Sequence, residues 1–151
     1  MPRFNFRLQQ YLGVKEQIEN QKELEYAQAL RKVEEEKLLL SQINAKKSEQ
    51  LESLRTALKT IIAPLEIRRY NNTIDRLKQR IKEQEERLTA AQEYAETKRQ
   101  ELVQAMKERK ALDVVREHAF DDYKIEMNLK EQKQVDELVS AKYVRKGTKK
   151  E

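Results

Sequence analysis

Few residue types in this 151-residue sequence could carry out catalysis or hold a metal. His118 is the single histidine and there is no cysteine, so a zinc site lacks a ligand set and a cysteine nucleophile is excluded. The two glycines, Gly13 and Gly147, are too far apart to form a phosphate-binding loop. Carboxylates are abundant, but we expect them to be solvated on a thin protein without a substrate pocket. We therefore expect no enzymatic activity and no cofactor, and we interpret His118 as an ordinary boundary residue.

The composition predicts that the chain forms long helices with the charged side chains on their surface. Hydrophobic residues make up 38% of the chain and charged residues 39%, which is too little apolar material for a thick globular core. Disordered chains of similar polarity are rich in proline and glycine, whereas this sequence has two of each. Ala, Glu, Lys, Leu, Gln and Arg dominate, and at heptad spacing such a mixture is typical of a coiled coil.

The second half of the chain contains the clearer heptad pattern. Steps of three and four alternate without a slip through Ile67, Tyr70, Ile74, Leu77, Ile81, Gln84, Leu88, Ala91, Ala95, Lys98, Leu102, Ala105, Arg109, Leu112, Arg116, Ala119 and Tyr123. The pattern loosens beyond Tyr123. This half is predicted to form one long amphipathic helix.

The first half shows a similar but interrupted pattern. Its predicted seam consists of Tyr26, Leu30, Val33, Lys37, Leu40, Asn44, Lys47, Leu51, Leu54, Leu58, Ile61 and Leu65. Asn44 and Lys47 could fix the register of the pairing at a cost in stability. An equally good interpretation is that the seam is thin enough for lysine side chains to reach water.

Pro64, the only internal proline, predicts the point where the two helices separate. We expect a single coiled-coil hairpin over residues 1–151, with helix one at about 5–62, a turn at about 62–66, helix two at about 66–140 and a basic tail at 141–151. The fold class is all-α, a long two-helix antiparallel coiled-coil hairpin. The alternative is one kinked helix that dimerises, so the oligomeric state of the free chain stays open.

The expected register leaves part of helix two without a partner. With the turn centred near Ala63, residue i faces about residue 126 minus i. The N-terminal end of helix one then lies opposite about His118. Residues from about 124 to 140 then overhang, and they include Ile125, Met127, Leu129, Val135 and Leu138. Apolar residues on an unpaired helix predict a surface for another protein, unless the segment frays.

Charge and targeting signals narrow the class further. The 32 basic and 27 acidic residues are interspersed, with Glu83 and Arg87, and Glu126 and Lys130, at the i,i+4 spacing of helical ion pairs, which argues against nucleic acid as a partner. The exception is the basic tail, which we interpret as a frayed, solubilising terminus and which contains Lys142, Arg145, Lys146, Lys149 and Lys150. No apolar run resembles a signal peptide or a membrane span, so we expect a soluble, cytoplasmic protein.

Three stretches give the sequence a family resemblance. They are Phe4-x-Phe6-Arg7-Leu8-Gln9-x-x-Leu12, Glu108-Arg109-Lys110-Ala111-Leu112 and, as the most specific, Glu131-Gln132-Lys133-Gln134-Val135-Asp136-Glu137-Leu138. In order and spacing they resemble the FliJ family of flagellar export proteins, which belong to the bacterial type III flagellar secretion apparatus. The resemblance extends over the whole chain.

The resemblance implies a non-enzymatic protein that docks into the export ATPase hexamer like the central stalk of a rotary ATPase. It also implies coupling to the membrane export gate, contacts with an ATPase regulator and export chaperones, and peripheral association with the inner membrane at the flagellar base. For the ATPase ring we expect contacts from the overhang, through Glu131, Gln132, Lys133, Asp136, Glu137 and Leu138.

The candidate gate surface consists of Tyr70, Ile74 and Leu77. The plainer interpretation of these three is structural, because they occupy heptad positions and are expected to pack against Leu54, Leu58 and Ile61. Two rival functions remain: a structural stalk subunit of a rotary ATPase, and a basic nucleic-acid-binding helix.

Overall fold

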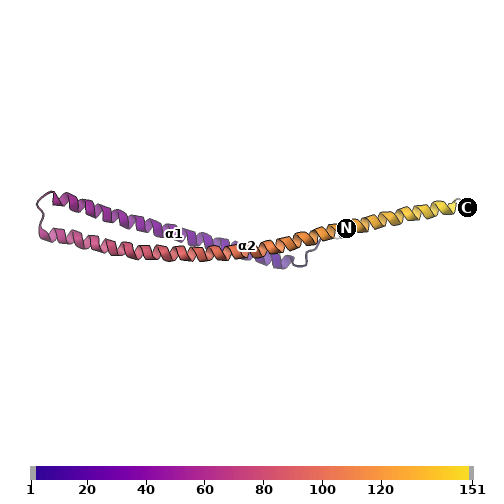
Figure 1. The fold of residues 1–151 in the computed structure, drawn as a ribbon, viewed down its shortest axis with the longest axis horizontal. Coiled ribbons are helices and arrows are strands. Elements are labelled where there is room, and N and C mark those ends of the chain that lie inside the picture. Colours follow the sequence, from indigo (N-terminus) through magenta and orange to yellow (C-terminus); the bar gives the residue numbers. More distant parts are fainter. Residues whose placement is uncertain (1–2, 150–151) are drawn as a thin grey trace. The chain divides into compact units, whose positions relative to one another are not determined.

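The computed structural model describes residues 3–149, with Lys149 described by its backbone alone, and this part of the chain is all-α. Helix α1 spans Gln9–Leu58 and helix α2 spans Pro64–Lys149. The chain divides into two compact units. The hairpin unit contains residues 19–105, and the overhang unit combines the residues before Glu19 with those after Ala105. In the hairpin unit α1 and α2 run antiparallel on either side of one connection, which confirms the predicted helical hairpin (Figure 1).

The connection between the helices follows from local chemistry around Pro64. Proline suits the first position of a helix because its missing N–H would have no intrahelical acceptor there. The Ala63 carbonyl accepts hydrogen bonds from the Glu66 and Ile67 amides at 3.0 and 3.3 Å, which starts α2. At the end of α1 the Thr60 amide and hydroxyl both donate to the Ala57 carbonyl, at 3.2 and 3.0 Å. These bonds satisfy carbonyls that the last turn of α1 leaves without partners.

The observed helix bounds differ from the expected ones at three places. Helix α1 begins at Gln9 rather than near residue 5 and ends at Leu58 rather than near 62. Helix α2 continues to Lys149, through the segment expected to be a frayed tail. Lys146 and Lys149 stand in the last turn of α2, where the helix dipole favours positive charge. Lys150 and Glu151 lie outside the described residues.

The seam predicted for α2 is present in the structure. In the hairpin unit its members Ile74, Leu77, Gln84, Ala95 and Ala105 are buried. The remaining predicted members between Ile67 and Leu102 are half-buried. In the overhang unit every predicted member except the exposed Arg116 is half-buried.

The seam predicted for α1 was wrong at every second position. The structure buries Ala29, Glu36 and Ile43 and half-buries Gln50 and Ala57, each one residue before the predicted member. Leu30 is 43% exposed, whereas Ala29 is 3% exposed. Apart from Ile43, these positions on the face where the helices approach carry small or polar residues, and leucines lie beside them. Asn44 is exposed, so it does not fix the register, while Lys47 is half-buried.

The register also differs from the expected one by about one helical turn. Lys22 should face residue 104 if residue i faces 126 minus i, but it pairs with Glu101. The cause is the early end of α1, because the midpoint between Leu58 and Pro64 is residue 61 rather than 63.

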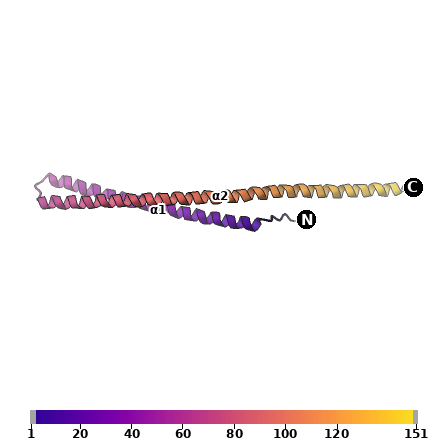
Figure 2. The ribbon, with the colours of Figure 1, turned by 60° about the horizontal axis from the view of Figure 1, so that its bottom comes forward.

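Apolar side chains among residues 3–18 hold the overhang unit together. Leu12 is 1% exposed and Phe6 is buried. Phe4 contacts Phe120 and Tyr123, with ring centroids 5.1 and 5.4 Å apart. Beyond these rings every described side chain from residue 128 to 148 is exposed. Figure 2 shows the last part of α2, in yellow, without another segment of this unit beside it. We call residues 124–149 the overhang.

Candidate protein-binding surface

One line of side chains along the overhang combines exposed apolar groups with polar ones. A helix turns about 100° per residue, so positions that alternate steps of three and four lie on one face. Ile125, Leu129, Gln132, Asp136, Val139 and Tyr143 follow this spacing. Their apolar members are between 48% and 76% exposed. We call these six residues the docking stripe.

The docking stripe divides the six residues predicted to bind the ATPase ring. Gln132 and Asp136 belong to it. Lys133 lies beside the stripe, about 80° around the helix from its centre, while Glu131, Glu137 and Leu138 lie about 120–140° away, by their spacing. All six are exposed and none forms an ion pair or side-chain hydrogen bond with another described residue. The structure therefore brings two of the predicted residues onto a face with apolar neighbours.

The heptad seam that pairs with α1 lies on a different face of α2 from the docking stripe. The seam reaches Tyr123 and Met127, the last half-buried residues. Ile125 and Leu129 each follow a seam residue by two positions, which places them roughly 160–200° around the helix. The stripe is thus a second, separate apolar face.

The three residues expected to contact the export gate lie in the hairpin unit. Ile74 and Leu77 are buried and Tyr70 is half-buried. The expected packing against Leu58 and Ile61 was wrong, because Leu58 is 54% exposed and Ile61 is fully exposed in the connection. Ile61 and the exposed Leu65 are therefore apolar groups at the turn that the heptad interpretation had assigned to the seam.

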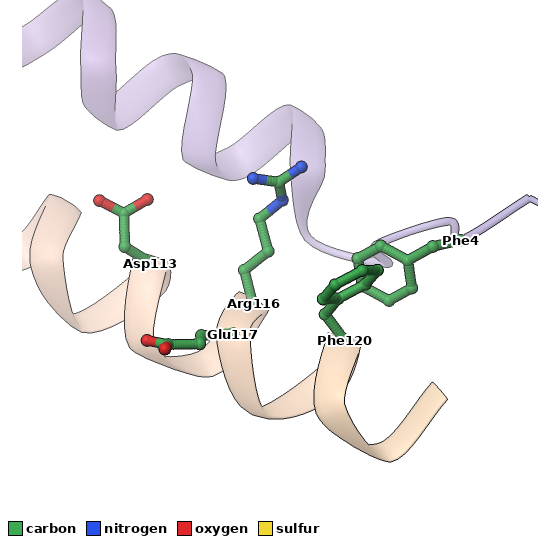
Figure 3. A pocket seen from close by; sticks show the side chains of 5 residues that line it. All are labelled: Phe4, Asp113, Arg116, Glu117 and Phe120. Carbon is green, nitrogen blue, oxygen red and sulfur yellow. The ribbon is translucent and has the colours of Figure 1, made fainter. Parts of the chain in front are cut away.

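A cavity of about 360 Å³ lies in the overhang unit where the N-terminal segment meets α2. Figure 3 shows Phe4 against Phe120, with Asp113, Arg116 and Glu117 along the same wall. The ammonium of Lys124 lies 4.6 Å from the centre of the Phe120 ring, a cation–π contact. Sequence analysis missed this aromatic cluster, because Phe4 lies outside both heptad patterns. It fastens the N-terminal segment to α2 immediately before the overhang.

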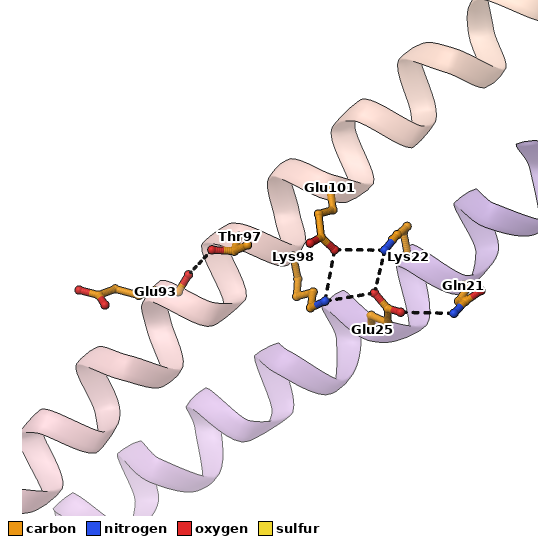
Figure 4. Close-up of polar contacts among 7 residues, drawn as sticks. All are labelled: Gln21, Lys22, Glu25, Glu93, Thr97, Lys98 and Glu101. Carbon is orange, nitrogen blue, oxygen red and sulfur yellow. Dashed lines mark hydrogen bonds and ion pairs between the residues drawn. The ribbon is translucent and has the colours of Figure 1, made fainter.

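Four charged side chains join the helices of the hairpin unit (Figure 4). Glu101 accepts hydrogen bonds from Lys22 and Lys98 at 3.2 Å each, and Glu25 accepts from the same two ammonium groups at 3.3 and 3.4 Å. We call these four residues the charge quartet. Because each acid contacts both lysines, the quartet fixes the local alignment of the two helices.

The quartet perturbs the pKa values of its members in opposite directions. Hydrogen bonds from Lys22 and Lys98 hold the pKa of Glu101 below its ordinary value. Desolvation alone would raise the pKa of Glu25, but the Lys22 hydrogen bond and both lysine charges outweigh it, so the pKa falls. The hydrogen bond to Glu101 raises the pKa of each lysine.

These directions predict the pH range in which the quartet stabilises the hairpin. The glutamate contribution is present above the ordinary value of 4.5 and is lost as pH falls further. The lysine contribution is present below 10.5 and is lost as pH rises further. We expect a flat melting temperature between these values.

Glu101→Gln should lose less melting temperature between pH 6 and pH 3 than the native chain, measured by circular dichroism melts. The exposed Glu93→Gln should match the native pH profile. An unchanged profile for Glu101→Gln would contradict this role.

A buried polar pair crosses the seam of the hairpin unit at Glu36 and Gln84. The Gln84 amide donates to both the side-chain carboxylate and the backbone carbonyl of Glu36, the latter at 3.1 Å. Lys32 pairs with the same carboxylate at 3.0 Å, and its hydrogen bond, with that of Gln84, lowers the pKa of Glu36. Gln84 was predicted to be a seam residue, but its partner was not.

Elsewhere the expected helical ion pairs are partly present. Glu126 and Lys130 pair at 3.5 Å on the overhang. Glu83 accepts a hydrogen bond from Gln79 at 3.3 Å, rather than pairing with Arg87. Among the described residues no group of acidic or histidine side chains could hold a metal ion. The described helices also include no stretch apolar enough to cross a membrane.

The fold is a long helical hairpin whose overhang carries an exposed apolar stripe. A sequence profile described as "Flagellar FliJ protein" matches residues 4–148. The chain therefore belongs to the FliJ family, and it is a component of the flagellar protein export apparatus. The family is non-catalytic. No curated protein and no solved structure matches the chain.

Proposed function

We propose that the chain docks into the ring of the flagellar export ATPase through the docking stripe of α2. The observation that carries this proposal is the exposed apolar and polar face on the overhang, which has no partner among the described residues. Exposed apolar residues in register on one helical face are the usual anchor of helix-in-groove recognition. Asp136 and Gln132 lie between these anchors and would supply the polar contacts that set orientation.

A single helix can enter a six-fold ring only by making unequal contacts around it. The overhang suits such a role, because the sides of α2 differ. The docking stripe is mostly apolar, while Glu126, Lys130, Lys133 and Glu137 carry mixed charges beside it. The stripe would anchor the helix on one part of the ring, and the charged side would meet the remaining subunits.

The second proposed contact joins the chain to the membrane export gate through the turn end of the hairpin unit. Ile74 and Leu77 are buried between the helices, so their primary effect is to hold the pair together. Tyr70, which is half-buried, and the exposed Ile61 and Leu65 are the side chains available to a partner there. The chain would thereby link the ATPase to the gate without hydrolysing ATP itself.

The proposed location follows from these two partners. We place the chain in the cytoplasm, peripherally associated with the inner membrane at the flagellar base. An ATPase regulator and export chaperones are the further expected partners, and exposed helical faces outside the stripe are free for them. No residue is assigned to these contacts.

Alanine variants on the two sides of the overhang test ring docking. Gln132→Ala/Asp136→Ala removes one amide and one acid from the docking stripe. Gln134→Ala/Glu137→Ala removes the same groups from the opposite side. We expect the stripe variant to bind the hexameric export ATPase roughly tenfold to hundredfold more weakly, with unchanged helicity, and the control to bind within about twofold of the native chain. Equal affinities for both variants in a surface-binding assay would remove the stripe from the interface.

A further inference from the structure

The overhang carries a second feature, beyond the docking stripe, in its last three turns. Lys142, Arg145, Lys146 and Lys149 follow the spacing i, i+3, i+4 and i+7, which places these positions on one face of α2. No acidic residue occurs between Leu138 and Lys149. We call these four residues the basic face. It differs from most of the chain, where acidic and basic residues are interspersed.

The basic face has no counter-charge among the described residues. Lys142, Arg145 and Lys146 are exposed and form no ion pair there. Several basic side chains elsewhere pair with an acid one turn away on the same helix, as Arg99 does with Glu96 at 2.7 Å. Lys142 and Lys146 instead stand one turn apart, where like charges repel. The helix dipole favours cations only in the last turn, so it does not explain Lys142 and Arg145.

Exposed apolar side chains border the basic face. Leu138 precedes Lys142 by one turn on the same face, and Val139 and Tyr143 lie next to it around the helix. Leu138 and Tyr143 are 67% and 76% exposed. A helix with a basic side, an adjoining apolar side and a tyrosine at the boundary is typical of segments that lie in a membrane interface.

We propose that the basic face binds an anionic lipid surface, with Leu138, Val139 and Tyr143 entering the headgroup region. The change in charge pattern along the overhang favours lipid over a protein partner. Residues 124–137 carry mixed charges, which align one protein on another, whereas a purely basic face suits a uniformly anionic surface. Nucleic acid would offer no site for the leucine and valine side chains. The inference rests on the proposed location at the inner membrane and shares Val139 and Tyr143 with the docking stripe, whereas Lys142, Arg145 and Lys146 lie outside the stripe.

The expected affinity follows from the number of cations. Each lysine or arginine near an anionic membrane contributes about a fivefold gain in partitioning, so four give a partition coefficient on the order of 10³ M⁻¹. Binding of this strength is peripheral and reversible, and it weakens with salt because the charges are screened. Millimolar lipid would therefore be needed to observe it.

The test is sedimentation of the full chain, without ATPase, with vesicles of phosphatidylglycerol and phosphatidylethanolamine. Lys142→Gln/Arg145→Gln/Lys146→Gln should reduce partitioning about hundredfold, because three charges are lost. The matched control Lys46→Gln/Lys78→Gln/Lys82→Gln removes three exposed lysines from the hairpin unit and should bind like the native chain. Tyr143→Ser should weaken binding several-fold with no change in charge.

Three results would overturn the proposal. The first is native-like partitioning of the Lys142, Arg145 and Lys146 variant, and the second is equal binding to vesicles of phosphatidylcholine alone. The third is tighter binding to a non-lipid polyanion than to the vesicles. Preference for an RNA duplex would assign the basic face to nucleic acid, and preference for polyglutamate would assign it to an acidic protein. ATPase binding measured on the same variants separates failure of this inference from failure of ring docking.

Discussion

A chain shortened to end at Tyr123 should lose binding to the export ATPase while it keeps the melting temperature of the full chain. The described side chains from residue 128 to 148 are all exposed, so removing them takes away almost no buried surface. The aromatic contacts of Phe4 with Phe120 and Tyr123 remain in the shortened chain. We expect at least a hundredfold loss of affinity, because the whole proposed interface is deleted. Circular dichroism melts and a surface-binding assay with the hexamer measure the two quantities.

The control for this truncation is a chain that ends at Ala141. It keeps Gln132, Asp136 and Val139 but lacks the basic face, and it should bind the ATPase within a few-fold of the native affinity. It also loses Tyr143, so the pair of truncations separates the docking stripe up to Val139 from Tyr143 and the basic face. Retention of full affinity by the chain ending at Tyr123 would place the ATPase contact elsewhere.

Gln84→Leu should lower the melting temperature by roughly 5–10 °C, the largest effect expected from one substitution in the hairpin unit. Gln84 is 4% exposed and donates to both the carboxylate and the backbone carbonyl of Glu36. Leucine would fit the seam but would remove one donor from each of these acceptors, leaving the buried carboxylate with Lys32 as its remaining partner beside an apolar side chain, which costs more than the added apolar contact returns. Gln79→Leu is the matched control, because Gln79 is exposed and its partner Glu83 stays solvated. An unaltered melting temperature for Gln84→Leu would show that the polar pair contributes nothing.

The double variant Glu36→Leu/Gln84→Leu tests whether this pair fixes the register. Replacing both members removes the buried carboxylate together with the amide that serves it, so thermal stability should return to the native value or exceed it. The expected cost is specificity, since an all-apolar seam tolerates slippage by a heptad more readily. Gln84 is itself replaced in this variant, so a cysteine pair at Leu40 and Gln84 could not report on its register. Positions 22 and 101, in the charge quartet, are the better sites for a disulfide reporter. Slower or incomplete disulfide formation in the double variant is the expected sign of a loosened register.

The fold class could be predicted because it follows from features that need no partner. Pro64 marks the start of α2 by its own chemistry, and the α2 seam contains apolar residues at nearly every heptad position. The α1 seam could not be predicted in the same way. Hydrophobicity selects Leu30 over Ala29, but the approach of Ala95 and Ala91 from α2 makes the small residue the better one to bury.

The sequence predicted which segment of α2 would lack a partner helix, but not which of its residues share one face. An early end to the pairing predicted that residues after Tyr123 lack a partner helix, and the side chains from residue 128 to 148 are exposed although the register shifted by one turn. The five polar residues among the six predicted contacts could not be ranked, because their value depends on which apolar side chains share their face. The structure separates Gln132 and Asp136 from Glu137 once the orientation of the α1-facing seam is known. Ile74 and Leu77, which the sequence offered as candidate gate contacts, are instead buried between the helices.

The most direct test of ring docking is site-specific photo-crosslinking in the assembled complex with the export ATPase. A crosslinking residue at position 132 lies on the docking stripe, and one at position 51 replaces an exposed leucine of α1. Docking through the overhang predicts a crosslink to the ATPase from position 132 and none from position 51. Crosslinks from position 51 alone would contradict it and would place the ring around the hairpin unit instead.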